Sequence, residues 1–136
     1  MCIIDKVAFI YIVDMKILST RSKGKNKYYI PGGKREGLGT DIETDLETLV
    51  REVKEELSVD VIPKSAKLYG VFKAQADGNP DGVIAKMTCY TADFIGDIKA
   101  SAEIAECVWL SYEDIEDVSP VDKLIFNDLK SKGLLL

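Results

Sequence analysis

Alternating apolar positions divide the first part of the chain into short strands. Apolar runs from Val7 to Val13 and from Lys16 to Thr20 predict two strands. Asp14 and Met15 between them favour a tight turn, so we expect these strands to pair as a hairpin. The polar stretch Arg21 to Lys27 is expected to be a loop. Tyr28 to Ile30 then predicts a short strand that stops at a Pro-Gly-Gly run.

From Thr40 onward the apolar period changes from two residues to about 3.6, which predicts an amphipathic helix that ends near Ser58. Thr40 and Glu43 have the spacing of a capping box, and Thr44 is an alternative start. The predicted buried stripe consists of Leu46, Leu49, Val50, Val53 and Leu57.

The second half of the chain returns to strand patterns and ends with a helix. Runs from Lys67 to Ala76 and from Val83 to Ile95 flank a turn-forming stretch and predict a hairpin. Residues 107–110, with Trp109, predict another strand. Ser119 followed by Pro120 is typical of a helix start. The buried stripe of this helix is predicted to be Val121, Leu124, Ile125 and Leu129.

This order of elements predicts the fold class and the domain organisation. Strands on both sides of a central helix, with a second helix at the end, indicate an α/β sandwich with a mixed sheet. A chain of 136 residues that is 46% apolar is expected to form one domain over residues 1–136.

Composition and charge exclude several kinds of chemistry. The chain has no histidine, so triads and metal sites that need imidazole are excluded. Its three cysteines are scattered, which predicts neither a disulfide framework nor a zinc site and favours a reducing cytoplasm. A net charge of -5 argues against a nucleic-acid polymer as partner. The opening apolar run is too short to span a membrane.

Acidic residues gather on the polar face of the first predicted helix. Glu52 lies three residues before Glu55 and four before Glu56, so their carboxylates project from neighbouring points. Like charges at these spacings cost roughly 0.2–0.5 kcal/mol per pair, a cost that a bound divalent cation would reverse. Oxygen ligands alone favour Mg²⁺ or Mn²⁺. The alternative is a solvated helix face on which Arg51 and Lys54 screen the glutamates.

The residues before and along this helix resemble the signature of the Nudix hydrolases. They are Pro31-Gly32-Gly33-Lys34, then Gly37, five residues, Glu43, seven residues, Arg51-Glu52-Val53, one residue, and Glu55-Glu56. The family pattern continues with one residue, a glycine and an aliphatic residue, whereas this chain has Leu57-Ser58-Val59. That glycine normally ends the helix in a left-handed conformation. Serine there is expected to cost stability rather than to remove chemistry.

A second departure lies in the loop that enters the helix. In many family members the second glycine of the Pro-Gly-Gly-Lys run is itself the first glycine of the signature, but here Gly37 fills that place. Residues 35–40 therefore look like a small insertion. The resemblance implies a backbone carbonyl as a metal ligand, which we assign to Gly37, with Gly33 as the alternative.

The resemblance covers essentially the whole chain and implies a Nudix-type α/β/α sandwich and a role for each residue of the signature. Glu52 and Glu56 would be metal ligands, and Glu55 would be a further ligand or would position metal-bound water. Arg51 would orient Glu52, and Glu43 would close the loop onto the helix. Glu52 is also the predicted base for the attacking water. Glu103, just before the tryptophan strand, is predicted to be an additional ligand or base; an ordinary exposed glutamate is the alternative.

The chemistry expected of such a site is hydrolysis of a phosphoanhydride. Clustered carboxylates can hold Mg²⁺, which lowers the pKa of the attacking water and neutralises charge on the phosphoryl oxygens. The expected substrate is a nucleoside diphosphate linked to another group: a nucleoside triphosphate, an oxidised nucleotide or a compound like ADP-ribose. A nucleotide-binding regulatory module without turnover is the rival function. RNA processing lacks the extended basic surface that a polymer requires.

Substrate contacts are predicted from the basic and aromatic residues near the Pro-Gly-Gly run. Lys34, Arg35 and Tyr29 are the candidates, with a solvated hairpin and core packing as the alternatives. The resemblance leaves a homodimer open. The apolar tail of residues 134–136 hints at docking against another surface.

Overall fold

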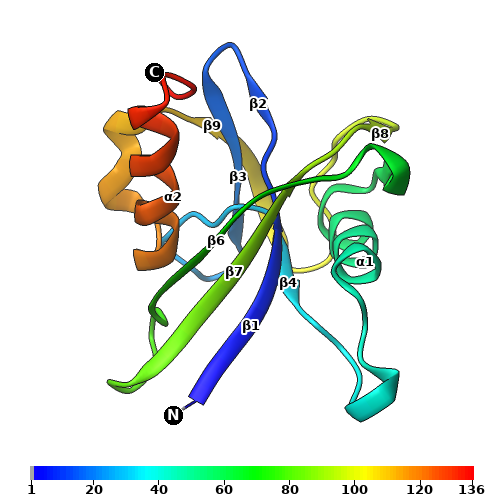
Figure 1. The fold of residues 1–136 in the computed structure, drawn as a ribbon. Coiled ribbons are helices and arrows are strands. Elements are labelled where there is room, and N and C mark those ends of the chain that lie inside the picture. Colours follow the sequence, from blue (N-terminus) through cyan, green and yellow to red (C-terminus); the bar gives the residue numbers. More distant parts are fainter. Residues whose placement is uncertain (1) are drawn as a thin grey trace.

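Two helices lie on opposite sides of the strands in the computed structural model of the protein, which describes residues 2–136 (Figure 1). A four-stranded sheet has the order β4-β1-β7-β6, in which β1 and β7 run parallel and the other neighbours antiparallel. A second sheet contains β2, β3 and β9, and β5 pairs with β8. The strands are β1 (Cys2–Phe9), β2 (Ile12–Val13), β3 (Lys16–Ser22), β4 (Gly32–Lys34), β5 (Asp60–Val61), β6 (Lys67–Gln75), β7 (Val83–Thr91), β8 (Phe94–Ile95) and β9 (Ile104–Leu110).

The buried apolar residues form two cores, and each core contains one of the two helices. The helices are α1 (Asp45–Leu57) and α2 (Pro120–Ser131), with short 3-10 helices η1 (Gly39–Asp41), η2 (Pro63–Ser65) and η3 (Tyr112–Asp117). Val7 and Phe9 of β1 pack in the core that contains α1, whereas Ala8 packs in the core that contains α2. Alternation along one strand thus serves both cores, and the predicted α/β sandwich with a mixed sheet is confirmed.

The predicted opening strand, residues 7–13, is wrong as one unit. β1 ends at Phe9, and the Ile10 N–H donates to the Tyr90 carbonyl at 2.8 Å, beside β7. Only Ile12 and Val13 pair with β3. A continuous apolar run looks the same whether its residues belong to one sheet or to two. The tight turn is confirmed, because Asp14 and Met15 have φ values of 52° and 62°, as a two-residue hairpin turn requires.

The short strand predicted at Tyr28–Ile30 is also displaced. Tyr28 and Tyr29 make only isolated bridges, and the antiparallel partner of β1 is Gly32–Lys34, within the run that was predicted to stop the strand. Gly32 has φ +144°, and a Cβ there would collide with the Val7 carbonyl oxygen. Glycine allows the backbone to run close beside β1, so the Pro-Gly-Gly run forms an edge strand instead of ending one.

Helix α1 begins and ends as local chemistry requires. Thr44 and Glu47 form the capping box, so the alternative start is confirmed, and Thr40 lies in η1 instead. Leu49 is fully buried, as is most of the predicted stripe. The helix ends at Ser58, which has φ 63° and adopts the left-handed conformation expected of the missing glycine.

The remaining elements follow the prediction with local corrections. β6 and β7 form the predicted hairpin, but the run predicted to Ile95 breaks after Thr91, and β8 pairs with β5. α2 begins after Ser119 with Pro120 at its first position. Leu124 is wrongly placed in the buried stripe, because 42% of it is exposed, whereas Phe126 is fully buried.

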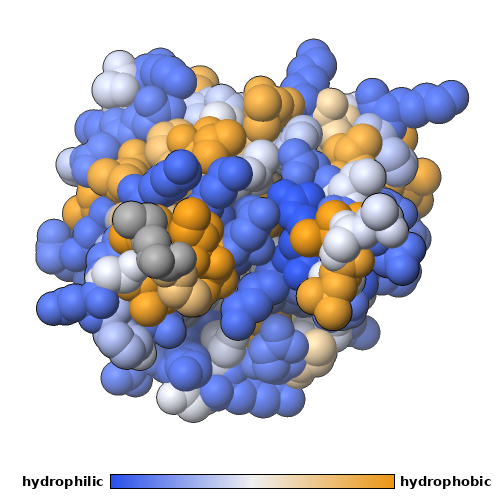
Figure 2. Space-filling view, turned by 60° about the horizontal axis from the view of Figure 1, so that its bottom comes forward, coloured by the Kyte–Doolittle hydropathy of each residue, from blue (hydrophilic) through white to orange (hydrophobic). Residues whose placement is uncertain are grey.

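The loop before α1 exposes apolar side chains, whereas the apolar tail at the chain end is partly buried. Leu38 and Ile42 of the loop are exposed, and Figure 2 shows apolar areas separated by hydrophilic side chains at this end of the molecule. The apolar tail docks on its own chain: Leu135 is buried, and the Leu136 N–H donates to the Met15 carbonyl at 2.9 Å. Within residues 2–136, the helices are too short or too polar to cross a membrane.

Candidate active site

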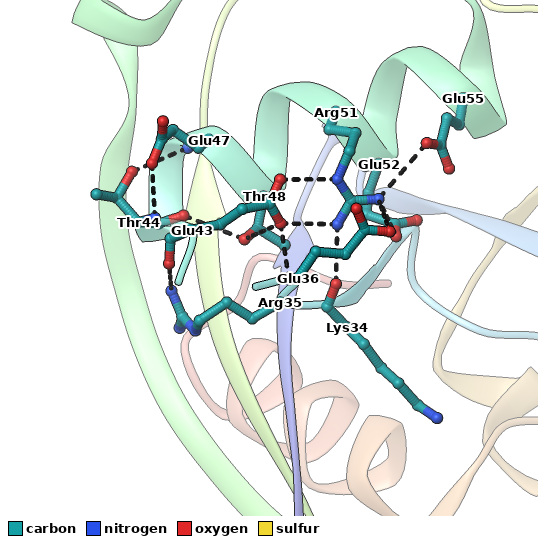
Figure 3. Close-up of polar contacts among 10 residues, drawn as sticks. All are labelled: Lys34, Arg35, Glu36, Glu43, Thr44, Glu47, Thr48, Arg51, Glu52 and Glu55. Carbon is teal, nitrogen blue, oxygen red and sulfur yellow. Dashed lines mark hydrogen bonds and ion pairs between the residues drawn. The ribbon is translucent and has the colours of Figure 1, made fainter. Parts of the chain in front are cut away.

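Arg51 organises the polar face of α1. Its guanidinium donates two hydrogen bonds of 2.8 Å to the Glu43 carboxylate, one of 2.8 Å to Glu52 Oε1, and one of 2.9 Å to the Lys34 carbonyl (Figure 3). The hydrogen bonds from Arg51 lower the pKa of Glu43 to about 2. Four contacts fix the planar guanidinium, and with it one oxygen of Glu52. The predicted orienting role of Arg51 depends on this contact.

Glu43 joins the inserted loop to the helix. Its Oε1 accepts hydrogen bonds from the Glu36 N–H at 2.9 Å and from the Thr48 hydroxyl at 3.0 Å. The loop is also held by the Arg35 side chain, which pairs with Asp45 at 2.7 Å. These are the contacts that a residue closing the loop onto α1 must make.

The Gly32–Gly33 segment lies against the two glutamates predicted to bind metal. The Gly32 N–H donates to Glu56 Oε1 at 2.9 Å. A Cβ built on Gly33 would collide with the carboxylate of Glu52. Glycine at position 33 is therefore required for Glu52 to lie where it does.

Gly37 lies elsewhere in the loop. It has φ +100°, and the atoms nearest to a Cβ built there belong to Asp41 and Ile42. Gly37 therefore serves the turn of the loop, while Gly33 adjoins the carboxylates. These contacts favour Gly33, the alternative from the sequence, for the backbone position at a metal.

Burial, with added repulsion from neighbouring carboxylates, raises the pKa values of Glu56 and Glu52. Glu56 is only 7% exposed, and its pKa is raised to about 8, first by burial and then by the charges of Glu52, Glu103 and Glu55. Burial also raises the pKa of Glu52, although the hydrogen bond from Arg51 opposes the increase. A cation placed among these oxygens would relieve both effects.

Glu103 lies in a loop that is fastened to the end of α1. The Ser101 N–H donates to the Glu56 carbonyl at 3.1 Å, and the Ser58 hydroxyl donates to the Lys99 carbonyl at 3.2 Å. The Glu103 carbonyl accepts from the Lys23 N–H at 2.8 Å. The Glu103 side chain is exposed, but its charge contributes to the raised pKa values of both Glu52 and Glu56.

The donor set fits a hard divalent cation, but its side chains are not gathered around one point. Within residues 2–136 no three acidic, histidine or cysteine side chains are arranged as a metal site. Glu52 accepts a hydrogen bond from Arg51, and Glu56 accepts one from Gly32. These two hydrogen bonds keep the two carboxylates apart. All donors are oxygens, and the charges of these carboxylates raise the pKa values of Glu52 and Glu56, which is the chemistry that a hard divalent cation such as Mg²⁺ or Mn²⁺ prefers.

A cavity of about 260 Å³ extends from Glu56 and the two glycines to the first turn of α2. Tyr29 and Asp122 are among its lining residues. Asp122 is fully buried, its Oδ2 accepts from the Ile30 N–H at 2.9 Å, and burial raises its pKa to about 7. Sequence reasoning missed Asp122. Its signal was a carboxylate on the same helix face as the apolar Val121 and Ile125.

The predicted substrate contacts have different surroundings. Tyr29 lines the cavity, and its hydroxyl donates to Asp77 at 2.6 Å, with Lys27 on the other oxygen of Asp77 at 3.1 Å. Figure 3 shows the Lys34 side chain pointing away from α1. Arg35 is only 12% exposed at its side chain and is committed to Asp5 and Asp45. Of the three predicted contacts, Tyr29 alone lines the cavity.

A family model and several solved structures match this protein over most of its length. A family model described as NUDIX domain matches residues 4–129. Among solved structures, the E. coli ORF135 protein has 25% sequence identity and a TM-score of 0.72, with 96% of this chain and 91% of that chain covered. A MutT protein from Methanosarcina mazei Go1 has 20% identity and a TM-score of 0.73, with coverage of 97% and 96%. A MutT NUDIX hydrolase from Burkholderia pseudomallei has 18% identity and a TM-score of 0.72, with coverage of 93% and 98%. A search among curated proteins found no match.

Proposed function

We propose a metal-dependent reaction for this chain, which belongs to the Nudix family and is a Nudix pyrophosphohydrolase. It would need Mg²⁺ or Mn²⁺ to cleave a nucleoside diphosphate linked to another group. The observation that carries this proposal is the position of Glu52 and Glu56 beside Gly32–Gly33, with Glu56 and the two glycines at one end of a cavity. The phosphates would lie at the carboxylate end, and the nucleoside would enter the cavity. The substrate would be a nucleoside triphosphate, an oxidised nucleotide or an ADP-ribose-like compound.

The metal would be held by Glu52, Glu55, Glu56 and Glu103, with Gly33 as the adjoining backbone position. When bound, it would supply charge neutralisation on the phosphoryl oxygens and a lowered pKa for water. Gly33 replaces our sequence assignment of Gly37, because Gly33 adjoins Glu52 and Gly37 packs on its own loop.

The chain's own residues would then position and deprotonate the nucleophile. Glu52 would accept a proton from the attacking water, and its burial, which raises its pKa, suits a base. Arg51 would hold the other oxygen of Glu52 through the 2.8 Å hydrogen bond. Attack at phosphorus would release a nucleoside monophosphate-type product and a second phosphate-bearing product.

We also propose the compartment in which the protein works and the kind of partner that it binds. Its three cysteines are free, which supports the reducing cytoplasm that we propose. Small nucleotides, rather than nucleic-acid polymers or membranes, are the proposed partners. A homodimer stays a prediction.

The test is to incubate purified protein with Mg²⁺ or Mn²⁺ and nucleoside triphosphates, oxidised nucleotides, ADP-ribose and dinucleotides, and to identify the products. We expect turnover that a chelator abolishes, and that falls at least about 100-fold in Glu52→Gln, which removes a ligand charge without changing shape. Glu47→Gln is the matched control, because it makes the same change on α1 and its amide oxygen can still accept from the Thr44 N–H. No turnover with any compound would favour the regulatory binding module instead.

A further inference from the structure

The four-stranded sheet exposes apolar side chains on the part of its α1 face that lies beyond the helix. Val7 of β1 packs in the core that contains α1, and side chains alternate along a strand, so Ile3 projects from the same face. The register places Ile84 of β7 beside Ile3, and Val71 of β6 beside Thr88, the partner of Val7. Ile3 is 49% exposed and Val71 is 48% exposed. Apolar side chains grouped on one exposed face are typical of an interaction surface.

Two lysines lie side by side among these apolar residues. Lys73 of β6 and Lys86 of β7 are direct cross-strand partners, and like charges in such a pair destabilise a sheet. Among residues 2–136, no carboxylate lies within the 4.0 Å of an ion pair with either lysine. Asp5 is the partner of Lys86 on β1, but its Oδ2 accepts from Arg35 at 3.3 Å. We call this surface the open sheet face, and it suits an apolar and acidic partner. It consists of Ile3, Val71, Lys73, Ile84 and Lys86.

The inserted loop before α1 carries both of these properties on the same chain. Leu38 is 88% exposed, more than any other large apolar side chain that the structure describes, and Ile42 is 49% exposed. Asp41 is exposed between them, and no basic group of the described residues lies within ion-pair distance of it. We call Leu38, Asp41 and Ile42 the loop tip.

The loop tip is held in one shape by the chain itself. The Glu43 N–H donates to the Glu36 carbonyl at 2.8 Å, and the Glu36 N–H donates to Glu43 Oε1 at 2.9 Å. Inside this closed loop, the Asp41 N–H donates to the Leu38 carbonyl at 3.0 Å. A surface that is already ordered loses little conformational freedom when it binds. An exposed leucine on such a loop is therefore suited to anchor a partner.

The loop tip and the open sheet face lie at the same end of the molecule. Arg35, where the loop begins, pairs with Asp5 on this face of β1 at 3.3 Å. Figure 2 shows apolar areas at this end with hydrophilic side chains between them. The loop tip is apolar and acidic, whereas the open sheet face is apolar and basic, so the two are complementary. Because Leu38 stays exposed on its own chain, the two surfaces can meet only when they come from different copies.

We propose that the loop tip of one copy docks on the open sheet face of a second copy. A two-fold axis relates the copies, so each contributes one loop tip and one sheet face, and the contact is made twice. The Asp41 carboxylate lies beside Lys73 and Lys86 and relieves their repulsion, while Leu38 packs among the apolar side chains. This dimer does not depend on the proposed reaction, since neither surface includes a residue of the proposed metal site.

Sedimentation equilibrium of the full chain measures the dimer and its Kd. We expect a monomer–dimer equilibrium in the wild type, and a Kd at least about 10-fold higher in Leu38→Ser, because an apolar anchor is lost from both contacts. Leu124→Ser is the matched control: it removes an exposed leucine from α2, outside both surfaces, and should leave the Kd unchanged. A wild type that stays monomeric at its highest soluble concentration would overturn the inference.

An exchange of charges tests which surfaces meet. Lys73→Glu places an acid opposite Asp41, and Asp41→Lys places a base opposite Lys73, so each variant alone should dimerise at least about 10-fold more weakly. In an equimolar mixture, the substituted loop of one variant faces the substituted sheet of the other, and both remaining native surfaces also match. The mixture should therefore form heterodimers with close to the wild-type Kd.

Lys16→Glu is the control for net charge, because it makes the same change in an exposed lysine of β3 outside both surfaces. It should keep the wild-type Kd, and thermal unfolding should show that all variants fold like the wild type. Wild-type dimerisation by Lys73→Glu alone would overturn the inference, as would a mixture that stays as weak as its components. These outcomes do not involve turnover, so they leave the proposed function standing.

Discussion

Glu56 on α1 and Asp122 on α2 are two buried carboxylates that bind the same strip of backbone. Glu56 accepts the Gly32 N–H and Asp122 accepts the Ile30 N–H, each at 2.9 Å. Burial raises the pKa of both groups. Their charged neighbours differ, because the charges of three other glutamates act on Glu56, whereas the charge of Lys6 acts on Asp122. The same local bond thus holds two carboxylates in different electrostatic surroundings, and the one that other carboxylates repel is the one that we propose for the cation.

Glu56→Gln is the strongest way to break this comparison. We expect turnover to fall at least about 100-fold, because a ligand charge is lost while the amide oxygen still accepts from Gly32. Thermal unfolding with and without Mg²⁺ gives a second readout: the wild type should be stabilised by Mg²⁺, and the variant much less. Asp122→Asn is the control and should keep the full Mg²⁺ effect. Equal stabilisation of Glu56→Gln and wild type would contradict the metal assignment.

The pH dependence of stability sharpens the comparison from the Asp122 side. A carboxyl whose pKa is near 4 unfolded and about 7 folded holds its proton longer in the native state. Stability of the wild type should therefore fall as pH rises from about 4 to 7, by on the order of 2–4 kcal/mol, relative to Asp122→Asn. Urea unfolding of both proteins without metal measures this, and Glu56 is the same in both. Parallel stability curves would show that Asp122 ionises freely in the fold.

The smallest expected effect concerns Ser58, which ends α1 next to Glu56. Ser58→Gly should relieve the cost of the left-handed backbone, about 1 kcal/mol, but lose the hydroxyl contacts with Lys99 and Ser101. We expect a net change below about 1 kcal/mol. Ser58→Ala keeps the backbone cost and loses the contacts, so it should be destabilised by roughly 1 kcal/mol. Chemical denaturation of both variants measures the difference, and a stable alanine variant would show that the hydroxyl is unimportant.

Local signals predicted the parts of the molecule that local chemistry determines. The capping residues and apolar period located α1, and the spacing of Glu52 and Glu56 predicted the surface on which we propose the metal site. The Ser119-Pro120 pair located the start of α2. These features depend on residues within one or two turns of each other, so a sequence can display them.

Features set by distant contacts were missed. The break between β1 and β2 depends on pairing with β7, which lies more than seventy residues away along the chain. The edge strand at Gly32–Lys34 depends on close contact with Val7. Asp122 reaches the Ile30 N–H, 92 residues away in sequence, only because α2 packs beside it. Propensity and periodicity carry no information about which segment will lie opposite.

The strip that joins the two carboxylates has a further consequence. Pro31 lies between the two donating residues, its ring fixes one backbone angle, and its carbonyl accepts from the Phe9 N–H at 2.8 Å. The three-residue segment is therefore rigid, and it fixes the spacing between the N–H that Asp122 accepts and the N–H that Glu56 accepts. Inserting one residue into this segment would change the spacing between Glu56 and Asp122, even though both carboxylates were kept.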